Sequence, residues 1–449
     1  MTTFDVSWVR AQFPSLTQSV SGQPAVFFDG PGGTQVPHQV IDAISNYLIH
    51  ANANLHGAFA TSQRTDTTVA AAHSAMADFL GCDPDEVVFG ANMTTLTFAM
   101  SRAIGRELEP GDEIVVTRLD HDANVAPWVA LQERGVVIRY VDIDVENCTL
   151  DLNDLRQQIN QRTKLVAIGY ASNAVGTIND VAEATRLAHR VGALAFIDAV
   201  HYAAHGPIDV RSLDCDFLAC SPYKFFAPHS GVLYSKREHL LRLKPYKVRP
   251  STEELPGRWM TGTQSHEAMA GVTATVEYLA ELGRTFAGGR RQVAQGSSAT
   301  DDYEAKLVDS TARESQYDQI ADETSPSRRA ALLSAMRAIQ AYERTLAEKL
   351  IKGLLEVPGL TFYGIREPER FESRTPTVAM RIEGHTPREL AEFLGQRGVF
   401  TWDGNYYALN LTERLGVEES GGMLRIGLVH YNTAEEIDRL FGALHEIAD

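Results

Sequence analysis

Residues 216–234 read DFLACSPYKFFAPHSGVLY, two short apolar runs joined by a loop that carries one lysine, Lys224. The runs at 217–219 and 231–234 are apolar at nearly every position, which is typical of strands covered on both faces. Tyr223 precedes the lysine, and two phenylalanines follow it. Alone, such a lysine is usually a solvated side chain that lies over its aromatic neighbours. If apolar groups shield it, the amine loses its proton more readily and becomes a nucleophile.

The segments before this stretch alternate between two hydrophobic periods. We expect strands at 86–89, 113–116, 136–141, 165–168 and 193–197, with helical patterns such as 181–191 between them. Asp66 is expected to cap a helix that continues to Leu80. Strands and helices in alternation predict an α/β domain with a mostly parallel seven-stranded sheet and helices on both faces.

The C-terminal part has a different pattern. An amphipathic helix is expected from Leu332 to Leu354, followed by strands at 377–382 and 423–429. Thr433 and Glu436 have the spacing of a capping box at the start of a closing helix. We expect an N-terminal segment (1–30) packed on the small domain, a large domain (31–285), a polar insertion (286–327) and a small α+β domain (328–449).

Composition excludes several classes of function. The 41 basic and 58 acidic residues give a formal net charge of -17, which argues against nucleic acid or an anionic membrane as a partner. No export signal and no bilayer-length apolar run is visible in the sequence. The four cysteines lack CxxC spacing, which argues against disulfides and a thiolate metal site. We expect a soluble protein in the cytoplasm.

Polar residues follow five of the expected strands. In open α/β sheets ligands bind at the carboxyl ends of the strands, so these side chains are candidates for one site. Each also has a plainer interpretation: the threonines and the aspartate as helix caps, and the histidine as a structural residue. The candidates are Thr94, Thr95, His121, Asn173, Asp198, His201, Ser221 and Lys224.

One ligand would use the whole set. A phosphorylated pyridine aldehyde needs an amine for its carbonyl, a carboxylate for its ring nitrogen and helix amides for its phosphate. The set therefore favours pyridoxal 5'-phosphate (PLP) as cofactor.

These motifs resemble the class V aminotransferase family of fold-type I PLP enzymes, and the cysteine desulfurases within it. The similarity extends from FDGPGG, which begins at Phe28, to YNTAEE, which ends at Glu436, apart from the insertion. It implies that Lys224 carries the Schiff base, Asp198 pairs with the ring nitrogen and His121 stacks on the ring.

The resemblance also assigns the other candidates. Asn173 and His201 would contact the ring oxygen, where desulfurases usually carry glutamine in place of His201. Thr94, Thr95 and Ser221 would hold the phosphate. Thr263 would reach the site of the neighbouring subunit, which implies a homodimer. Arg425 would bind the substrate carboxylate, because its planar fork makes two parallel hydrogen bonds to a carboxylate.

The sequence departs from the desulfurases at one position. Tyr407, in the loop WDGNYYA, stands where they carry a mobile cysteine, and none of the four cysteines lies after residue 220. A phenol cannot accept sulfur as a persulfide. His56 and the loop 402–407 are expected to line the substrate pocket.

The resemblance implies an enzyme that acts on an amino acid through an external aldimine and a Cα carbanion. We expect a cysteine desulfurase-like C–S lyase without a persulfide cysteine. Aminotransferase and epimerase activities are alternatives within the same family. A catalytically silent PLP-binding protein is an alternative of another class, although it would need none of Lys224, Asp198, His121 and Arg425.

Overall fold

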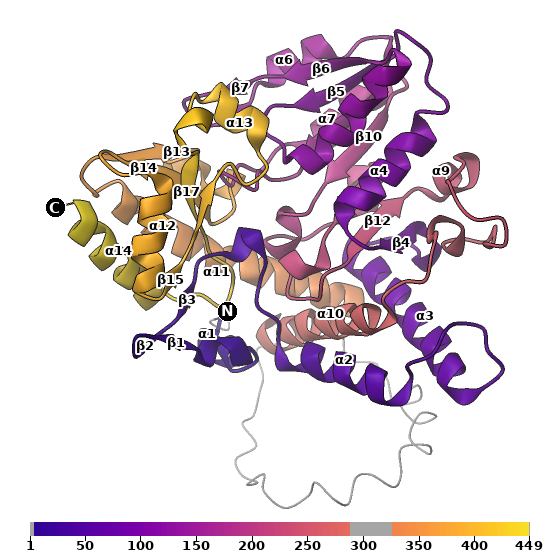
Figure 1. The fold of residues 1–449 in the computed structure, drawn as a ribbon, viewed down its shortest axis with the longest axis horizontal. Coiled ribbons are helices and arrows are strands. Elements are labelled where there is room, and N and C mark those ends of the chain that lie inside the picture. Colours follow the sequence, from indigo (N-terminus) through magenta and orange to yellow (C-terminus); the bar gives the residue numbers. More distant parts are fainter. Residues whose placement is uncertain (1–3, 288–325, 449) are drawn as a thin grey trace, which may run out of the picture.

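The computed structural model describes residues 4–287 and 326–448. Among these residues, a seven-stranded sheet forms the centre of the large domain (Figure 1), in the order β4-β12-β11-β10-β9-β5-β6. Its strands are Val87–Gly90 (β4), Glu113–Thr117 (β5), Val137–Val141 (β6), Thr163–Gly169 (β9), Leu194–Asp198 (β10), Phe217–Cys220 (β11) and Gly231–Ser235 (β12). β12 is antiparallel to both of its neighbours, and the pairings from β11 to β6 are parallel. The expected α/β class with a mostly parallel sheet is confirmed.

Helices cover both faces of this sheet, which explains why its strands are apolar at nearly every position. Successive residues alternate between the faces: Ile197 belongs to one buried cluster and Phe196 to the other. The first cluster contains residues of α3 (Ala60–Leu80), α7 (Val181–Arg190) and α10 (His266–Ala287), and the second residues of α4 (Met93–Ile104), α5 (Ala126–Val129) and α9 (Arg237–Arg242). None of the helices within the described parts of the chain is long and apolar enough to cross a lipid bilayer.

The C-terminal part contains a four-stranded antiparallel sheet in the order β13-β14-β17-β16. Its elements are Leu360–Tyr363 (β13), Thr377–Ile382 (β14), Trp402–Gly404 (β16) and Met423–Gly427 (β17), with helices Pro387–Gln396 (α12) and Ala434–Ala448 (α14). The expected capping box precedes α14. The Thr433 hydroxyl accepts from the Glu436 amide at 3.3 Å, and the Glu436 carboxylate accepts from the Thr433 amide at 3.1 Å.

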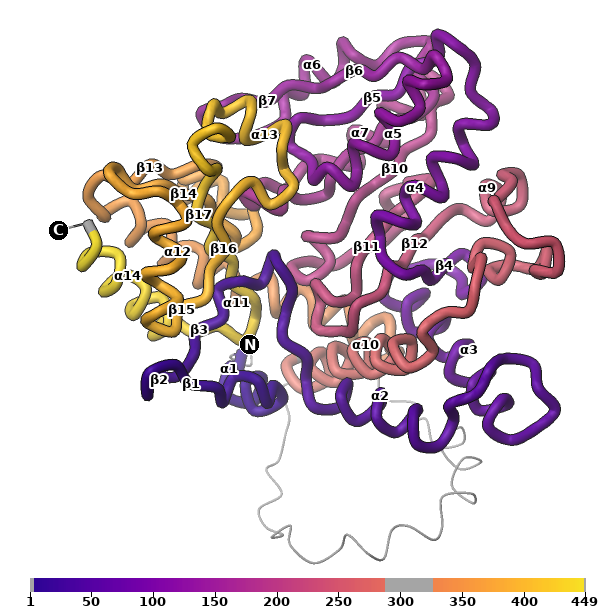
Figure 2. Tube along the Cα trace, in the orientation of Figure 1, coloured from indigo at the N-terminus to yellow at the C-terminus, as the bar shows by residue number. Residues whose placement is uncertain are grey.

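The N-terminal segment lies beside this sheet (Figure 2). β3 (Val26–Phe27) pairs in parallel with β15 (Val399–Phe400), and the Gly427 amide donates to the Phe28 carbonyl at 2.8 Å. The chain then runs through Asp29 and Pro31 toward the carboxyl ends of the large-sheet strands. Residues from the start of the sequence therefore reach the candidate site.

The expected amphipathic helix is α11 (Arg328–Leu354), and it contacts both domains. At its start, the Arg328 guanidinium donates to Asp78 at 2.6 Å and to Glu277 at 2.8 Å, on α3 and α10. Toward its end, Leu350 is buried in the core of the small domain. The expected polar insertion at 286–327 lies outside the described residues except at its two ends.

The prediction that Asp66 caps a helix is wrong. α3 begins earlier, at Ala60, and Asp66 lies inside it. The Asp66 carboxylate instead accepts a hydrogen bond from the backbone amide of His56 at 3.1 Å. The loop before α3 is held by hydroxyls of the helix, because Ser62 donates to the Asn54 carbonyl at 2.6 Å and Thr65 to the Ala51 carbonyl at 2.7 Å. Side chains of the first turns thus replace the expected cap.

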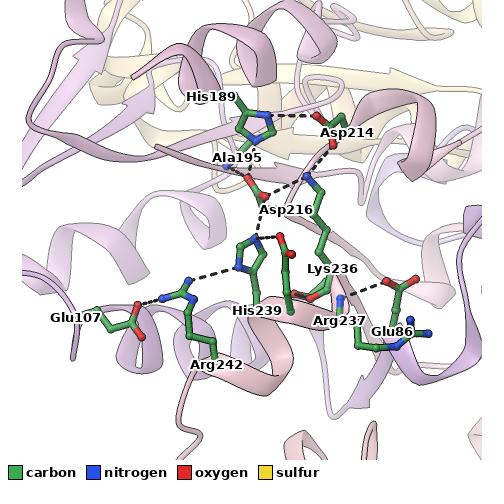
Figure 3. A network of polar contacts seen from close by, with 12 residues as sticks. Glu86, Glu107, His189, Ala195, Asp214, Asp216, Lys236, Arg237, His239 and Arg242 are labelled. Carbon is green, nitrogen blue, oxygen red and sulfur yellow. Dashed lines mark hydrogen bonds and ion pairs between the residues drawn. The ribbon is translucent and has the colours of Figure 1, made fainter. Parts of the chain in front are cut away.

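A charged cluster fixes the amino ends of β10 and β11 (Figure 3). The buried Asp216 carboxylate lies 2.9 Å from Nε2 of His189 and 2.9 Å from Nε2 of His239, and it accepts from the Ala195 amide at 2.8 Å. Lys236 lies 3.3 Å from the same carboxylate. Burial alone would raise the pKa of Asp216, but the two histidines, the amide and Lys236 outweigh it and hold the pKa below its usual range. The opposite ends of these strands form the candidate site.

Candidate active site

The carboxyl ends of β5, β9, β10 and β11 open on an inner cavity of about 70 Å³. Polar residues after each of these strands line it, together with residues at the start of α4. Of the residues that the sequence nominated, the cavity brings together Thr94, His121, Asn173, Asp198, His201, Ser221 and Lys224.

Lys224 lies at the end of a 3-10 turn, Pro222–Lys224, directly after β11. Its Nζ donates to the Pro31 carbonyl, and Nζ lies 5.0 Å from the centre of the Tyr223 ring. Burial lowers the pKa of Lys224 to about 7; Arg425 adds to the effect, while Asp198 and Asp29 oppose it. The amine therefore loses its proton far more readily than a solvated lysine does, which suits both a nucleophile and a base.

The two phenylalanines after Lys224 point away from it. Phe225 is fully buried and stacks on Phe79 of α3, with ring centres 4.9 Å apart. Phe226 is also fully buried and meets the edge of His430 at 4.3 Å. Both rings belong to the core, and Tyr223 supplies the aromatic contact of the lysine.

Asp198 ends β10 and lies almost completely buried in the inner cavity. One carboxylate oxygen accepts from the Val200 amide at 2.8 Å. Burial raises the pKa of Asp198 to about 7, with Asp120 adding to the effect and the Val200 amide and Lys224 opposing it. A cationic group on a ligand would stabilise the ionised form of this carboxylate.

His121 is held in one orientation by its own loop. Its Nδ1 accepts from the Ala123 amide at 3.0 Å, and its ring stacks on Tyr407 with ring centres 5.3 Å apart. Burial lowers the pKa of His121 to about 4, and Lys224 and Arg425 act in the same direction. The neutral ring forms part of the wall of both cavities.

A buried carboxylate supports this wall, and the sequence did not point to it. Asp120 accepts from the Gly169 amide at 2.9 Å, from the Thr117 hydroxyl at 2.8 Å and from the Asn124 amide nitrogen at 2.8 Å. These bonds join the ends of β5 and β9 directly beneath His121. The sequence signal that could have identified Asp120 is its position after a strand that is covered on both faces.

Asn173 and Arg425 are brought together from the two domains. The Arg425 guanidinium donates to the Asn173 carbonyl at 2.9 Å and lies 4.3 Å from the centre of the Tyr406 ring. The Asn173 side chain donates to the Tyr406 carbonyl at 2.9 Å. Asn173 Oδ1 and Arg425 Nε are buried without a hydrogen-bond partner. Burial lowers the pKa of Arg425 to about 10, so it stays a cation at neutral pH.

The amino end of α4 closes the inner cavity on another side. Asn92 caps this helix, and its side chain accepts from the amide and the hydroxyl of Thr95, each at 2.8 Å. Thr95 is therefore engaged in the helix cap, whereas Thr94 lines the cavity. β12 passes close by: a side chain at Gly231 would meet the backbone of Asn92 at 2.3 Å. Only glycine lets the strand approach the helix end this closely.

A larger outer cavity of about 670 Å³ adjoins the inner one, and both share Lys224, His121 and Asn173. Arg425 lines it from β17, and two carboxylates lie in its lining. Aromatic residues and glycines make up most of the rest of the wall. The residues from the predicted substrate loop and its surroundings are Tyr223, Trp402, Asp403, Asn405, Tyr406, Tyr407, Glu418 and Arg425.

Besides Thr95, two of the nominated residues do not line either cavity. The His56 side chain is 85% exposed and lies 3.4 Å from Asp66. Thr263 is exposed in the segment before α10. Their assignments, to substrate and to the site of a neighbouring subunit, stay predictions.

The four cysteines are free, and none of them lines either cavity of the described chain. Cys148, Cys215 and Cys220 are buried, and Cys82 is partly buried. Burial raises the pKa of all four thiols, that of Cys148 to about 12. At neutral pH each is held as the unreactive thiol.

Comparisons with known proteins agree with this architecture. The family model for class V aminotransferases matches residues 26–299 and 329–440. A cysteine desulfurase of Dickeya dadantii is 30% identical over 461 residues, which cover 99% of this chain and 97% of that protein.

Two solved structures share the fold. An apo cysteine desulfurase from Thermococcus onnurineus has a TM-score of 0.82 and 24% identity, and the match covers 100% of this chain and 99% of that one. A lysine-to-alanine mutant of C-DES, with glycine covalently linked to its PLP cofactor, has a TM-score of 0.73 and 18% identity, covering 97% and 99% of the two chains. The chain belongs to the class V aminotransferase family, among its cysteine desulfurase-like, PLP-dependent enzymes.

Proposed function

We propose that the chain is a PLP-dependent C–S lyase that acts on an amino acid and releases sulfur without a persulfide cysteine. One observation carries the proposal. Lys224, Asp198 and Arg425 converge on two joined cavities, and the described residues that line these cavities include no cysteine.

The residues of the inner cavity fit the cofactor. Asn173 Oδ1 is a buried acceptor without a partner, and the carboxyl group of Asp198 is buried with a raised pKa, so both gain from a ligand with complementary donors. Asp198 would hold the ring nitrogen, Asn173 and His201 the ring oxygen, and His121 a face of the ring. Thr94, Ser221 and the first amides of α4 would hold the phosphate, since a helix amino end favours an anion.

The chemistry divides between the cofactor and the protein. When bound, PLP supplies an aldehyde that condenses with amines and a ring that delocalises the electron pair left at Cα. Lys224 removes the Cα proton. Its pKa of about 7 lets it hold that proton and return it at neutral pH. The Asp198 carboxylate stabilises positive charge on the ring nitrogen.

Arg425 orients the substrate. It is buried at 4% exposure and keeps its charge, and one of its donors is satisfied by the Asn173 carbonyl. Arg425 lines the outer cavity, and its planar fork suits an α-carboxylate bound through two parallel hydrogen bonds. Because Arg425 and Lys224 line the same cavity, a carboxylate on Arg425 leaves Cα within the region that Lys224 reaches.

The described residues of the lining include no thiol, which supports direct release of sulfur over its transfer to the enzyme. A desulfurase transfers sulfur to its own cysteine, and its amino acid becomes alanine. The resemblance aligns Tyr407 with that cysteine, and Tyr407 is 72% exposed and stacked on His121. Sulfur therefore leaves directly from Cβ as a thiol. With cysteine and water, the products are pyruvate, ammonia and hydrogen sulfide.

The test is a substrate screen on the PLP-loaded protein. L-cysteine, L-cystine, S-alkyl cysteines, alanine and aspartate are offered separately, and pyruvate, sulfide or thiol, ammonia and alanine are measured. The proposal expects pyruvate and the sulfur product in equal amounts, with no added thiol acceptor. That product is sulfide from L-cysteine, a thiol from an S-alkyl cysteine and thiocysteine from L-cystine. The matched control is Lys224→Ala, which should form neither.

Other products would contradict the lyase. Alanine with sulfur bound to the protein, detected by intact mass, would show a desulfurase. Keto acid formed only with a second amino-acid acceptor would show an aminotransferase, and inversion of Cα without keto acid an epimerase. PLP binding without turnover of any amino acid offered would support the silent alternative.

A further inference from the structure

His201 follows β10 by three residues and is 5% exposed, with its ring in the wall of the inner cavity. A neutral imidazole has one donor nitrogen and one acceptor nitrogen. The nitrogen that carries the proton therefore decides whether His201 donates to a ligand or accepts from it. The glutamine that desulfurases carry at this position can do either by turning its amide.

Contacts from the small domain bear on this choice. Thr375, two residues before β14, is 2% exposed. Its hydroxyl oxygen lies 3.1 Å from Nε2 of His201 and 3.3 Å from the Gly176 carbonyl. If Nε2 carries the proton, Nε2–H donates to Thr375 and the Thr375 hydroxyl donates to Gly176, which makes two hydrogen bonds. If Nε2 lacks the proton, the hydroxyl can donate only once, and one bond is lost.

Nδ1 of His201 makes no hydrogen bond to the described residues. The cations near the ring are Lys224 and Arg425, and both disfavour a second proton on it. His205 packs its ring against His201 at 4.9 Å, and its Nδ1 lies 2.8 Å from the buried Glu343 carboxylate. Burial, His205 and the two cations lower the pKa of His201 well below its ordinary value. The ring is neutral, and a lone pair on Nδ1 is electrostatically favoured beside the cations.

We propose that Thr375 is a positioning residue that fixes His201 in the Nε2–H tautomer, so that Nδ1 presents only a hydrogen-bond acceptor to the ligand in the inner cavity. The site then accepts from a protonated ring oxygen, a hydroxyl, and gives no donor to an ionised one. This consequence rests on the proposed cofactor placement, whereas the tautomer does not.

The direct test is nitrogen NMR of protein labelled with ¹⁵N in its histidines, first without PLP. His201→Gln identifies the His201 signals by difference. In the wild type, the protonated nitrogen should be Nε2 and the bare one Nδ1. Thr375→Val removes the acceptor at nearly constant volume and should lower the Nε2–H to Nδ1–H ratio about fivefold, the equivalent of one hydrogen bond. Thr375→Ser keeps the hydroxyl and should behave like the wild type.

A second readout uses the PLP-loaded protein. If Nδ1 accepts from the ring hydroxyl, the pH at which the visible absorption band of the bound cofactor changes should move in Thr375→Val and stay in Thr375→Ser. A proton on Nδ1 in the wild type, or an unchanged tautomer in Thr375→Val, overturns the proposal. If Thr375→Val does not fold, Thr375→Ala takes its place, and an unchanged tautomer in that variant overturns the proposal. Failure of the lyase assay leaves the NMR result untouched, so the two proposals fail separately.

Discussion

β11 has a charged cluster at each end, and the two clusters differ in how their polar atoms are satisfied. At the amino end, both oxygens of Asp216 are engaged by His189, His239, the Ala195 amide and Lys236 (Figure 3). At the carboxyl end, Asn173 Oδ1 and Arg425 Nε are buried without partners among the described residues, and the hydrogen bond of Lys224 within the same part of the chain goes to the Pro31 carbonyl.

The difference separates stability from binding. A buried polar atom without a partner costs about 1–3 kcal/mol. The amino-end cluster avoids this cost and ties two strands to α7 and α9. The carboxyl-end cluster bears this free-energy cost while no ligand is bound, and a ligand would complete its hydrogen bonds. The same strand thus connects a cluster that stabilises the fold with one whose hydrogen bonds are incomplete until a ligand binds.

The largest expected effect is the loss of turnover when Lys224 is removed, and it is compared with the removal of Lys236 at the other end of β11. Lys224→Ala should reduce turnover by at least about 10³-fold, since it removes both the nucleophile and the base. The protein without PLP should melt at the same temperature or higher, because a largely buried amine is lost. Turnover and thermal unfolding of the purified variant measure the two effects.

Lys236→Ala is the matched control at the other end of β11. Lys236 lies 2.7 Å from Asp214 and 3.3 Å from Asp216. Its loss should lower the melting temperature and leave turnover within about twofold. The comparison fails if Lys224→Ala destabilises the protein more than Lys236→Ala does.

Asp216→Asn should have the next largest effect. It leaves two histidines and Lys236 around a neutral amide, and removing one partner of a buried charge cluster costs about 3–5 kcal/mol. We expect the lower end of this range, because His189 is 30% exposed and the amide keeps one acceptor. Urea denaturation measures the loss. Glu238→Gln, at an exposed carboxylate 3.9 Å from His239, is the control and should change little.

The two clusters should also respond to pH with opposite signs. The folded pKa of Asp216 is below its unfolded value of about 3.9, so its stabilisation is complete above about pH 4 and is lost as the pH falls through the folded pKa. The folded pKa of Asp198 is raised to about 7, so the folded state loses stability as the pH rises from about 4 to 7.

Denaturation of the PLP-free protein between pH 3 and 8 checks both signs. Relative to Asp198→Asn, the wild type should lose stability on the order of a few kcal/mol between about pH 4 and 7. Relative to Asp216→Asn, it should lose its advantage only below about pH 4. A loss at the same pH in both comparisons would remove the distinction between the clusters.

The sequence predicted the sheet well and the surroundings of the site poorly. The strands end within about two residues of their expected bounds, because a strand covered on both faces gives a local apolar signal that needs no long-range information. Asp198, Asn173 and Lys224 were nominated for the same reason, since they lie at the end of such strands or within four residues after it. The helix start near Asp66 was wrong because loop carbonyls, supplied by tertiary contact, bond to Ser62 and Thr65.

The contacts of the site that the sequence could not predict are made by residues far away in the sequence. The Pro31 carbonyl meets Lys224 across 193 residues, and the Tyr406 ring meets Arg425 through the pairing of β16 with β17. Thr375 reaches His201 across 174 residues. None of these three has a local pattern that distinguishes it from a structural residue. Phe226 shows the converse, because its neighbourhood in sequence suggested the site and its side chain lies in the core.

Arg425→Lys should have a smaller effect than Lys224→Ala or Asp216→Asn. A lysine keeps the charge but loses the fork and the donor to the Asn173 carbonyl, which should raise KM by roughly 10- to 100-fold, equivalent to about 1.5–3 kcal/mol for a charged hydrogen bond. Steady-state kinetics with the substrate found in the screen measure it. Arg381→Lys is the control, because the Arg381 guanidinium bonds to the Ser420 and Gly422 carbonyls and Arg381 itself lines neither cavity. Equal KM values for the two variants would exclude Arg425 from carboxylate binding.

Substitutions of Tyr407 should have the smallest effect. They test whether this residue stabilises the carboxyl-end cluster when no ligand is bound. Its ring stacks on His121 and its carbonyl accepts from the Asp122 amide at 2.7 Å, but the residue is 72% exposed and its hydroxyl makes no hydrogen bond to the described residues. Tyr407→Phe should therefore leave KM and the melting temperature nearly unchanged.

Tyr407→Ala should lose only the ring contact, worth about 0.5–1.5 kcal/mol for an aromatic pair and less at this exposure. We expect that loss in KM, because the ring borders the outer cavity, and only a slight change in melting temperature. If Tyr407→Ala instead lowers the melting temperature as much as Asp216→Asn does, the stack on His121 holds the fold. Tyr407 of the carboxyl-end cluster would then stabilise the fold as the amino-end cluster does. The contrast between the two ends of β11 would not hold at this residue.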